Sequence, residues 1–364
     1  MPRLDVFLPH LKTGGIEVGL VRLAPALLDR EISLRFVLQQ GTGELRARLP
    51  EGVQTIALDA RNMPAAARSY AAVLRGAPCD IVYSATNATN VAQLLAGRLL
   101  GRAAPLAIVG EHIPLDRFLQ TRKRPGLRRW IMRRTYPGAT AVVAPVPDIL
   151  DEHRVLLGRK CPPTTVLPNP VIDAVTALPP LAQTARRFVA IGRLSPEKGF
   201  DLALRVMAAY RAHDPQAHLM IYGEGSDRPR LEALLQELDL AGTVTLAGRT
   251  DDVPTALAAA DLFLCTSHVE GFGNAIVEAQ AAGVPVASVD CPFGPRLLLR
   301  EGRAGLLLRD RDAAGIAKAL HHFAGDTAGR FTAQQAGQAV AADYTLTRSA
   351  DAHAALFHEL AGGR

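Results

Sequence analysis

The chain has 364 residues, of which 48% are hydrophobic and 21% charged, and this composition excludes a disordered protein. At this length we expect two domains of ~150 to 200 residues each. Its apolar runs are shorter than the ~18 residues of a membrane-spanning helix, and no signal-peptide core is visible, so we expect a cytoplasmic protein. The net charge of +6 favours an anionic partner: a nucleotide, a nucleic acid or a membrane surface.

Short apolar and β-branched runs alternate with helical patterns along almost the whole chain, which predicts parallel sheets built from βαβ units. In the first half, the predicted strands are Leu4–Leu8, Leu34–Leu38, Val53–Leu58, Ile81–Tyr83, Leu106–Val109 and Ala141–Ala144. In the second half, they are Phe188–Ile191, Ala217–Tyr222, Val244–Ala247, Leu262–Cys265, Val286–Ser288 and Gly305–Leu308. Residues 164–187 lie between the two halves and are rich in proline, so they are predicted to lack regular structure.

This pattern predicts an α/β protein with two doubly wound, Rossmann-like domains that face each other across a cleft. We place the N-terminal domain at residues 1–170, a linker at 171–186 and the C-terminal domain at 187–343. The last residues, 344–364, are predicted to form a helix that folds back on the first domain. Because ligands of such sheets bind at the carboxyl ends of the strands, the loops after the strands are the place to look for functional residues.

The four cysteines (Cys79, Cys161, Cys265 and Cys291) lie far apart in the sequence, without CxxC or Cys/His metal spacing. We expect reduced, mostly buried thiols.

Two loops of the first half carry candidate residues. Gly14 and Gly15 stand between the first strand and a helix, where backbone NH groups can contact a phosphate. An ordinary turn is the alternative there. Glu111 and His112 follow a buried strand, and a histidine at the carboxyl end of a strand is a candidate site residue. The alternative is a histidine packed in the core.

Residues 117–136 hold eight arginines and lysines and no acidic residue. Pro125 suits the first turn of a helix, on which the apolar Leu127, Trp130 and Ile131 share one face while arginines occupy another. A basic amphipathic helix with an aromatic side chain is typical of membrane-surface elements, so we predict peripheral contact with an anionic membrane. A helix packed on the sheet with its charges in water is the alternative. Nucleic acid is disfavoured because aromatic residues are scarce.

In the second half, "AIGRLSPEKG" places Arg193 and Lys198 on one strand-to-helix loop that begins at Gly192. Two cations there suit a pyrophosphate, which arginine binds bidentately and lysine as a point charge. Two solvated charges are the alternative. The next strand is followed by Gly223 and Gly225, but a GxG alone is a weak signal, and the dinucleotide pattern GxGxxG fails because residue 228 is arginine.

The segment "EGFGNAIVE" carries two carboxylates, Glu270 and Glu278, in small and apolar surroundings. A buried carboxylate is costly unless something pairs with it. Asn274 is predicted to cap a helix whose N-terminus favours a phosphate, and the carboxylates would accept hydrogen bonds from sugar hydroxyls. In the alternative, Glu270 caps the helix and Glu278 pairs with an arginine. The residues predicted to shape a ligand site before the helix are Gly271, Phe272, Gly273 and Asn274.

These features together resemble the family 4 retaining glycosyltransferases of the GT-B fold, over nearly the whole chain. The most specific part is "EGFGNAIVE", the E-x7-E motif of that family, followed by "AAGVPV"; "GRLSPEKG", "GEG", the early "TGG" and "EH" fall in the family's order. Two departures stand out: "DCPFGPR" continues with Leu297, where a glutamate is usual, and "PNPVID" replaces the commoner Asn-Gly version of the linker motif.

The resemblance implies a nucleotide sugar bound on the second domain. Arg193 and Lys198 would hold its diphosphate, Glu278 would bind the ribose hydroxyls, and Glu270 would contact hydroxyls of the donor sugar.

The resemblance also implies that the first domain binds the acceptor. Gly15 would approach the phosphate, and His112 would lie at the sugar ring near the reaction centre. The implied reaction is retaining transfer of a sugar, with uracil the commoner base, to a hydroxyl of a lipid-linked saccharide or glycolipid at the cytoplasmic membrane face. The alternatives are the same chemistry on a small soluble acceptor and a nucleotide-sugar-binding protein without turnover.

A metal site is not predicted. The only Asp-x-Asp, Asp310 to Asp312, precedes a helix, where an N-cap role is expected. We therefore expect transfer without a metal or other cofactor, with the leaving diphosphate neutralised by Arg193, Lys198 and helix dipoles.

Overall fold

The computed structural model describes residues 1–120 and 123–363. The chain divides into two compact units, one formed by Met1–Pro170 with Leu346–Arg364 and the other by Val171–Thr345. Residues 171–186, expected as a linker, therefore lie within the second unit, and the helix at the C-terminus belongs to the first.

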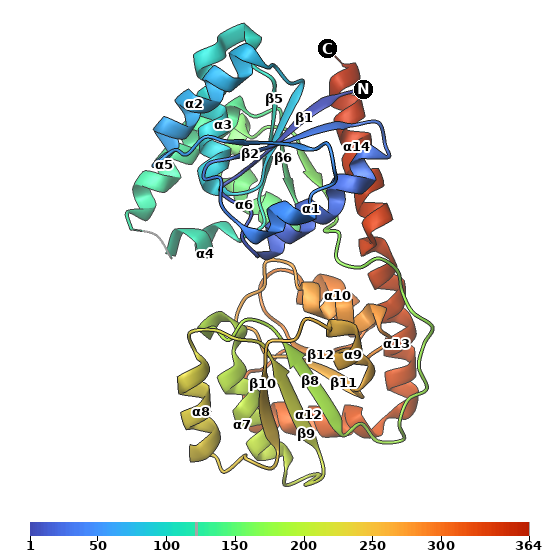
Figure 1. The fold of residues 1–364 in the computed structure, drawn as a ribbon. Coiled ribbons are helices and arrows are strands. Elements are labelled where there is room, and N and C mark those ends of the chain that lie inside the picture. The colour runs from blue at the N-terminus through green and yellow to red at the C-terminus, as the bar shows by residue number, and fades with distance from the viewer. Residues whose placement is uncertain (121–122, 364) are drawn as a thin grey trace. The chain divides into compact units, whose positions relative to one another are not determined.

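The first unit is a parallel sheet with helices on both faces (Figure 1). Within the described residues its strands are β1 (Arg3–Leu8), β2 (Ser33–Leu38), β3 (Gln54–Ala57), β4 (Ile81–Ser84), β5 (Leu106–Gly110), β6 (Ala141–Ala144) and β7 (Thr164–Val166). They lie in the order β3-β2-β1-β4-β5-β6-β7, and neighbouring strands are parallel. An order that runs outward in both directions from the first strand is that of a doubly wound, Rossmann-like sheet.

Successive side chains of each strand point to opposite faces of the sheet, so the core of this unit has two parts, one on each face. On one face, Val6 and Leu8 pack with α1 (Gly15–Leu28) and α14 (Leu346–Gly362). On the other, Phe7 packs with α2 (Met63–Gly76) and α3 (Asn87–Leu100). The remaining helices are α4 (Leu115–Gln120), α5 (Pro125–Thr135) and α6 (Pro147–Leu157).

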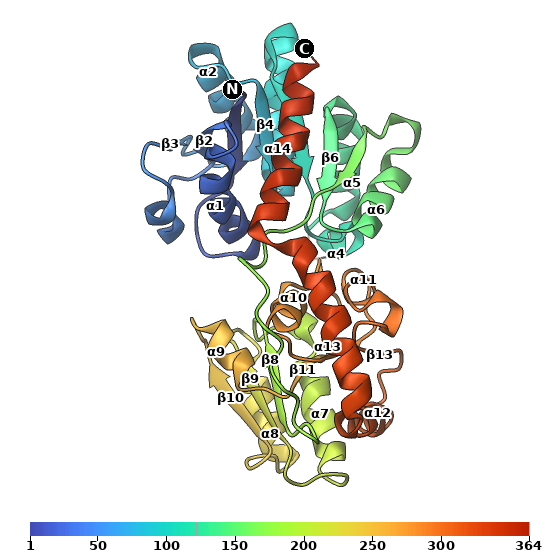
Figure 2. The same ribbon diagram turned by 90° about the vertical axis from the view of Figure 1, so that its right-hand side faces the viewer.

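The C-terminal helix α14 completes the first unit (Figure 2). Its buried Ala350, Ala354 and Phe357 join the same apolar cluster as Leu20 and Leu27 of α1. Helix α14 therefore closes one face of a sheet whose strands come from the beginning of the chain.

The second unit repeats the same architecture. Within the described residues its strands are β8 (Arg187–Ile191), β9 (His218–Tyr222), β10 (Val244–Gly248), β11 (Leu262–Cys265), β12 (Val286–Val289) and β13 (Leu306–Leu308). Their order is β10-β9-β8-β11-β12-β13, all parallel. The helices are α7 (Phe200–Tyr210), α8 (Arg228–Glu237), α9 (Val253–Ala258), α10 (Asn274–Ala281), α11 (Pro295–Leu298), α12 (Ala313–Gly325) and α13 (Thr327–Ala341). The predicted fold class, α/β with two Rossmann-like domains, is confirmed.

The expectation that residues 164–187 lack regular structure is wrong at their beginning. Thr164–Val166 form β7, which pairs in parallel with Val142–Ala144 of β6. A three-residue edge strand followed by prolines is possible because an edge strand leaves one row of NH groups unpaired, so the missing proline donors cost no ladder bond.

The proline-rich segment that follows is held by one stripe of side chains on α13. Arg330 donates from Nη2 to the carbonyl of Ala182 (2.7 Å), and Gln334 donates from Nε2 to that of Pro179 (3.0 Å). These bonds fix the segment to the second unit, although its proline content predicted an interdomain linker.

The four cysteines are free thiols, three of them buried and Cys161 half-buried, as expected. Among residues 1–120 and 123–363, no helix combines the length and apolar character needed to cross a membrane.

Candidate active site

The second sheet has its topological switch point between β8 and β11, the neighbouring strands whose following loops lead to opposite faces. Lys198 lies on the loop after β8, and Glu270 lies on the loop after β11. Both candidate residues therefore lie at the edge of the sheet where ligands of this fold bind.

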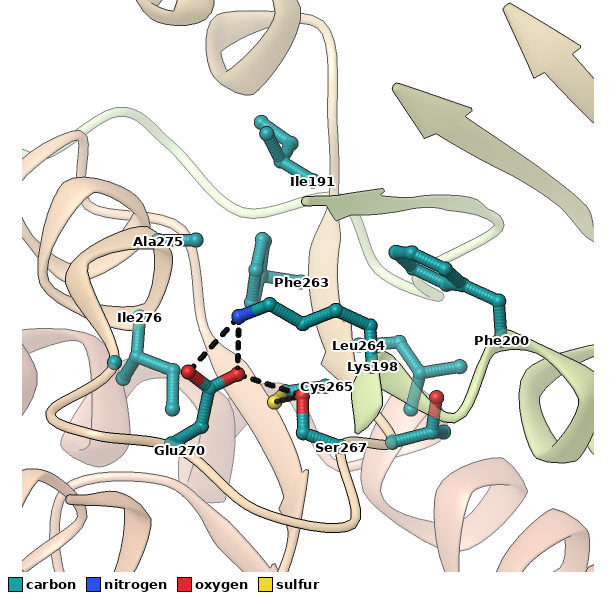
Figure 3. A pocket seen from close by; sticks show the side chains of 12 residues that line it. Ile191, Lys198, Phe200, Phe263, Leu264, Cys265, Ser267, Glu270, Ala275 and Ile276 are labelled. Atoms are coloured by element: carbon teal, nitrogen blue, oxygen red, sulfur yellow. Dashed lines mark hydrogen bonds and ion pairs between the residues drawn. The ribbon is translucent and has the colours of Figure 1, made fainter. Parts of the chain in front are cut away.

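The side chains of Lys198 and Glu270 pair directly with each other (Figure 3). The Lys198 Nζ donates to both carboxylate oxygens of Glu270, over 2.7 and 2.9 Å, and Ser267 Oγ donates to Oε1 over 2.6 Å. Glu270 is only 8% exposed. Burial by itself lowers the pKa of the Lys198 ammonium, but the charge and hydrogen bonds of Glu270 outweigh it and leave that pKa raised. Lys198 therefore stays charged near neutral pH.

This ion pair fills the small pocket at the switch point. The pocket holds a cavity of about 10 Å³, close to the space that a single water molecule needs. Its lining residues are Ile191, Lys198, Phe200, Phe263, Leu264, Cys265, Thr266, Ser267, Glu270, Gly273, Ala275 and Ile276. A cavity of this size has no room for a phosphate or a sugar.

Two loops are held together to make this arrangement. Thr266 Oγ1 donates to the carbonyl of Gly199 over 2.9 Å, and the His268 amide donates to the carbonyl of Glu197 over 2.8 Å. Gly199 has φ +61°, and a Cβ there would lie 2.2 Å from the Thr266 carbonyl oxygen. Only glycine allows this approach, which sets Lys198 opposite Glu270.

Arg193, the other predicted phosphate cation, takes a different position. Its side chain is 72% exposed, and Nη2 donates to Glu197 Oε1 over 2.8 Å. Gly192 lies against the Lys198 side chain, since a Cβ there would meet its Cδ and Cε at 3.5 Å. The structure thus brings Lys198, Gly192 and Glu270 together and leaves Arg193 on the exposed side of the same loop.

Gly223 and Gly225 allow the loop after β9 to pack on the loop after β8. A Cβ at Gly223 would lie 1.8 Å from the carbonyl oxygen of Gly192, and one at Gly225 would lie 2.1 Å from that of Leu194. The Leu194 amide also donates to the carbonyl of Glu224 over 2.9 Å. This GxG therefore has a packing role that the sequence did not reveal.

The prediction that Asn274 caps α10 is wrong. Gly273, with φ +109°, is the N-cap, and Asn274 is the exposed first residue of the helix. As a glycine, Gly273 provides no side-chain capping hydrogen bond. The left-handed conformation of Gly273 starts the helix one residue early, which removes Asn274 from the capping position.

The other predicted residues of this segment lie around the pocket in different ways. Gly271 is half-buried, and Gly273 lines the pocket. Phe272 is buried, with its ring edge-on to Tyr344 at 4.8 Å between centroids, so its ring packs in the core. Glu278 is half-buried in the second turn of α10 and is not one of the described residues that line the small pocket.

Sequence reasoning missed two residues here. Ser267 holds the Glu270 carboxylate, and Arg311 donates to the Ser267 carbonyl over 2.5 Å and to His268 Nδ1 over 2.8 Å. Because an arginine only donates, His268 accepts at Nδ1 and carries its proton on Nε2. The position of Ser267, directly after a buried strand, was the available signal; Arg311 follows a different strand and offered none.

Asp312 has the N-cap role expected of it, because its side chain accepts from the Gly315 amide over 2.7 Å. Among the described residues, no three histidine, cysteine, aspartate or glutamate side chains gather as a metal site would need.

In the first unit, His112 lies two residues beyond β5 and lines a separate pocket. The Tyr83 hydroxyl lies 3.4 Å from its Nε2. Burial, together with the nearby His353, lowers the pKa of His112 to about 4, so its imidazole is neutral at physiological pH. Gly14 is the N-cap of α1, and Gly15 begins that helix with open space at its Cα among the described residues. A ligand can therefore approach the Gly15 backbone closely.

The predicted basic helix is α5, and residues 121 and 122 of the stretch 117–136 lie outside the described residues. Leu127 is 48% exposed and Trp130 is 55% exposed, whereas Met132 and Thr135 form the buried side. Of the predicted apolar face, Leu127 and Trp130 are thus exposed, and Ile131 is half-buried.

Two family models match the chain. The one described as Glycosyltransferase Family 4 matches residues 13–174, and the one described as Glycosyl transferases group 1 matches residues 185–326. The first match lies almost entirely in the first unit, and the second lies in the second unit.

Individual proteins extend this comparison. The chain is 35% identical over 138 residues to the "Lipopolysaccharide core biosynthesis glycosyltransferase LpsE" of Rhizobium meliloti, which is 38% of this chain and 39% of that protein. It is 25% identical over 325 residues, 85% of this chain and 86% of the other, to a protein of Campylobacter jejuni named "N-acetylgalactosamine-N,N'-diacetylbacillosaminyl-diphospho-undecaprenol 4-alpha-N-acetylgalactosaminyltransferase". With several curated relatives, the chain aligns over less than half of their length.

Among solved structures, Anabaena Alr3699/HepE in complex with UDP has a TM-score of 0.79 with this chain at 20% identity, covering 99% of this chain and 100% of the other. At that identity the likeness shows the fold.

Proposed function

Since the chain belongs to the glycosyltransferases, with a family 4 domain in its first half and a group 1 domain in its second, we propose that it transfers a sugar from a nucleotide diphosphate sugar to a hydroxyl acceptor. The donor is a UDP-sugar, and the acceptor is a lipid-linked saccharide or glycolipid at the cytoplasmic face of the membrane. The sugar is transferred with retention of configuration, which gives an α-glycosidic bond.

The observation that carries this proposal is the Lys198–Glu270 pair at the switch point of the second sheet. A half-buried ammonium beside a buried carboxylate offers one group for an anion and one for hydroxyls, which are the two chemical parts of a nucleotide sugar. When the donor enters, Lys198 turns from Glu270 to the diphosphate, and Glu270 accepts from sugar hydroxyls. Glu278 takes the ribose hydroxyls, and Arg193, on the exposed side of the loop, takes the outer phosphate oxygens.

The reaction proceeds by front-face attack. The bond between the anomeric carbon and the phosphate oxygen breaks, and its electron pair stays on that oxygen. The acceptor hydroxyl forms the new bond on the same face, and its proton goes to the departing phosphate oxygen. His112, neutral because its pKa is about 4, orients the donor sugar and is not the main base.

The proposed transfer needs no metal, because Lys198 brings a positive charge to the leaving diphosphate. Its raised pKa supports this role. In the Asp-x-Asp sequence, Asp312 caps helix α12, because its carboxylate accepts a hydrogen bond from the Gly315 amide.

The lipid character of the acceptor is supported by helix α5. Its exposed Leu127 and Trp130 stand among exposed arginines, and the Arg134 guanidinium lies 5.4 Å from the Trp130 ring centroid. Apolar side chains inside a basic surface suit the headgroup region of an anionic membrane. The names of two relatives, a lipopolysaccharide core transferase and a transferase acting on a diphospho-undecaprenol saccharide, point the same way.

Turnover tests the proposal directly. Incubated with UDP-sugars, the full chain should release UDP slowly, and the released sugar should have the α configuration at first observation by NMR. Lys198→Met should release at least ~10-fold less, because its ammonium neutralises the leaving group. UDP binding without release by the wild type would identify a binding protein without turnover.

Vesicle flotation tests the acceptor side. The double variant Leu127→Ser with Trp130→Ser should lose binding to anionic vesicles, whereas Val155→Ser, at a position 84% exposed on α6, should keep it. Equal flotation of all three proteins, with anionic and neutral vesicles alike, would favour a soluble acceptor.

A further inference from the structure

The loop between β1 and α1, residues 9–14, lies at the switch point of the first sheet, where β1 and β4 are neighbours. It ends at Gly14, the N-cap of α1, which as a glycine provides no side-chain capping bond. The Val18 amide donates to the Gly14 carbonyl over 2.9 Å and starts the helical ladder. The helix amides before Val18 therefore have no partner within the helix, and a Cβ at Gly15 would meet no described atom within 4 Å. Backbone NH groups at such a helix end can donate to a phosphate.

Thr13, the residue before this N-cap, is held by a carboxylate from another loop. Glu44 Oε1 accepts from the Thr13 amide over 2.8 Å and also from the Thr13 hydroxyl. One oxygen thus fixes both the backbone and the side chain of Thr13, although the two residues are 31 positions apart in the sequence. The bond from the Thr13 hydroxyl is the main cause that lowers the pKa of Glu44 to about 2, so Glu44 is a carboxylate at neutral pH.

Glu44 is itself fixed, because its loop packs on the loop after β1. It begins the 3₁₀ helix Glu44–Arg48, and the next amide, that of Leu45, donates to the Leu11 carbonyl over 2.9 Å. Gly43, with φ +127°, lies so close that a Cβ there would be 1.9 Å from the carbonyl carbon of Leu11. Leu11 and Leu45 are both buried in the same apolar cluster. The carboxylate is therefore anchored at its backbone even though Glu44 is exposed.

The two consecutive glycines give this bond a purpose. Glycine adopts many backbone conformations, so Gly14 and Gly15 would be poorly ordered without a fixed residue before them. A ligand that meets an unordered loop must order it, which lowers affinity or rate, whereas a loop ordered beforehand avoids that cost. A carboxylate repels a phosphate, so direct contact between Glu44 and an anionic ligand is unfavourable. Ordering of the loop through Thr13 is the role that its contacts support.

We propose that Glu44 is a positioning residue for sugar transfer: through Thr13 it holds Gly14 and Gly15 in the conformation in which their amides donate to a phosphate of the substrate. The inference rests on the proposed function and deepens it, because it names the residue that prepares this loop for the leaving diphosphate. Ordered amides stabilise the negative charge that grows on the leaving phosphate in the transition state.

Hydrolysis kinetics test the effect on rate. The substrate is whichever of UDP-glucose, UDP-galactose and UDP-N-acetylglucosamine the wild type hydrolyses fastest. Glu44→Ala should lower kcat about 10-fold and change KM and UDP affinity by less than about 2-fold, because the amides act on charge that develops in the transition state. Glu44→Gln keeps an acceptor oxygen for Thr13, so its kcat should stay within about 3-fold of the wild type.

Hydrogen exchange, followed by mass spectrometry on the peptide that contains Gly14 and Gly15, measures the order of the loop without turnover. Exchange should be at least ~5-fold faster in Glu44→Ala than in the wild type and close to the wild-type rate in Glu44→Gln. Thr13→Val removes only the hydroxyl and should give an intermediate result in both assays, which also serves if Glu44→Ala does not fold.

The control is Glu51→Ala, an exposed carboxylate of the same unit, which should match the wild type in exchange, kcat and KM. Circular dichroism melts show whether each variant is folded at the assay temperature. A purely structural role of Glu44 would lower Tm without the selective loss of kcat and without its rescue by glutamine.

Three outcomes would overturn the inference: exchange in Glu44→Ala at the wild-type rate, faster exchange with unchanged kcat, or a Glu44→Gln variant that exchanges normally but turns over as slowly as Glu44→Ala. The last would show that the charge of Glu44 acts in the reaction and that its hold on Thr13 does not. Wild-type hydrolysis is intact in all three, so the proposed function would stand. Absence of hydrolysis in the wild type would instead contradict the proposed function, and the inference with it.

Discussion

Replacing Glu270 with glutamine isolates the charge of the ion pair from its shape. The change keeps the side chain's size and one acceptor oxygen for Ser267 but removes the negative charge 2.7 Å from Lys198 Nζ. Removal of one partner from a fully buried pair costs ~3–5 kcal/mol. Because the Lys198 side chain is 25% exposed, water screens part of this cost, and we expect the free energy of unfolding to fall by about 2–3 kcal/mol.

The same variant should bind a nucleoside diphosphate more tightly. With Glu270 neutral, the diphosphate no longer faces its carboxylate charge. For two charges taken as ~6 Å apart at an effective dielectric constant of ~20 to ~40, the repulsion removed amounts to roughly 1.4–2.8 kcal/mol, or about 10- to 100-fold in affinity. Sugar transfer should nevertheless fall, because the amide oxygen of glutamine accepts weaker hydrogen bonds from sugar hydroxyls than a carboxylate does.

Urea unfolding and calorimetry with UDP, on purified wild type and variants, measure both effects. Lys198→Met should also lose stability but bind UDP more weakly, so the two variants move affinity in opposite directions. Glu232→Gln, which removes an exposed pair with Arg228, should change stability by less than ~0.5 kcal/mol. If Glu270→Gln and Lys198→Met weakened UDP binding equally, the ion pair would not compete with the ligand and the reasoning would fail.

Three further predictions concern single positions. Gly225→Ala should lower the free energy of unfolding by at least ~2 kcal/mol in urea, because its Cβ would lie 2.1 Å from a backbone carbonyl oxygen, whereas Gly242→Ala, with open space among the described residues, should have little effect. Burial lowers the pKa of His353 to about 4, so the neutral imidazole stabilises the fold fully above its ordinary pKa of 6.5, and this stabilisation is lost as the pH falls toward 4. In His353→Gln, the loss of unfolding free energy between pH 6.5 and pH 4 should be about 2–3 kcal/mol smaller than in the wild type. An unchanged slope of stability against pH would contradict this. Ser267→Ala should slow sugar transfer about 10-fold and change UDP affinity by less than about 2-fold, because Ser267 donates to the Glu270 carboxylate that we propose contacts the sugar. Loss of UDP affinity would show a different role for Ser267.

The strands were predictable because each is a short apolar run between turn residues. Strands covered on both faces need apolar side chains at every position, which is why Ile81–Tyr83 and Leu262–Cys265 are plain in the sequence. The edge strand β7 (Thr164–Val166) was missed because an exposed edge imposes no such pattern, and the prolines beside it suggested a loop. The start of α10 was missed by one residue, since the left-handed φ of Gly273 is not encoded in a capping pattern.

The site was predictable residue by residue but not as a set of partners. A buried carboxylate is costly unless something pairs with it, and Glu270 was identified for that reason. That its partner is Lys198, 72 residues away, depends on which loops the sheet order brings together.

The central claim is that the second unit binds a nucleotide diphosphate sugar through Lys198 and Glu270. A thermal-shift panel of UDP, GDP, ADP and their common sugar conjugates, with and without EDTA, tests it most directly. A ligand at ~100 times its Kd stabilises a protein by ~2.7 kcal/mol, which is readily visible as a shift in Tm. We expect UDP and one UDP-sugar to raise Tm, and we expect each shift to be the same with EDTA as without it. Lys198→Met should reduce both shifts. A panel in which no diphosphate moves Tm, or in which Lys198→Met responds as the wild type does, would contradict it.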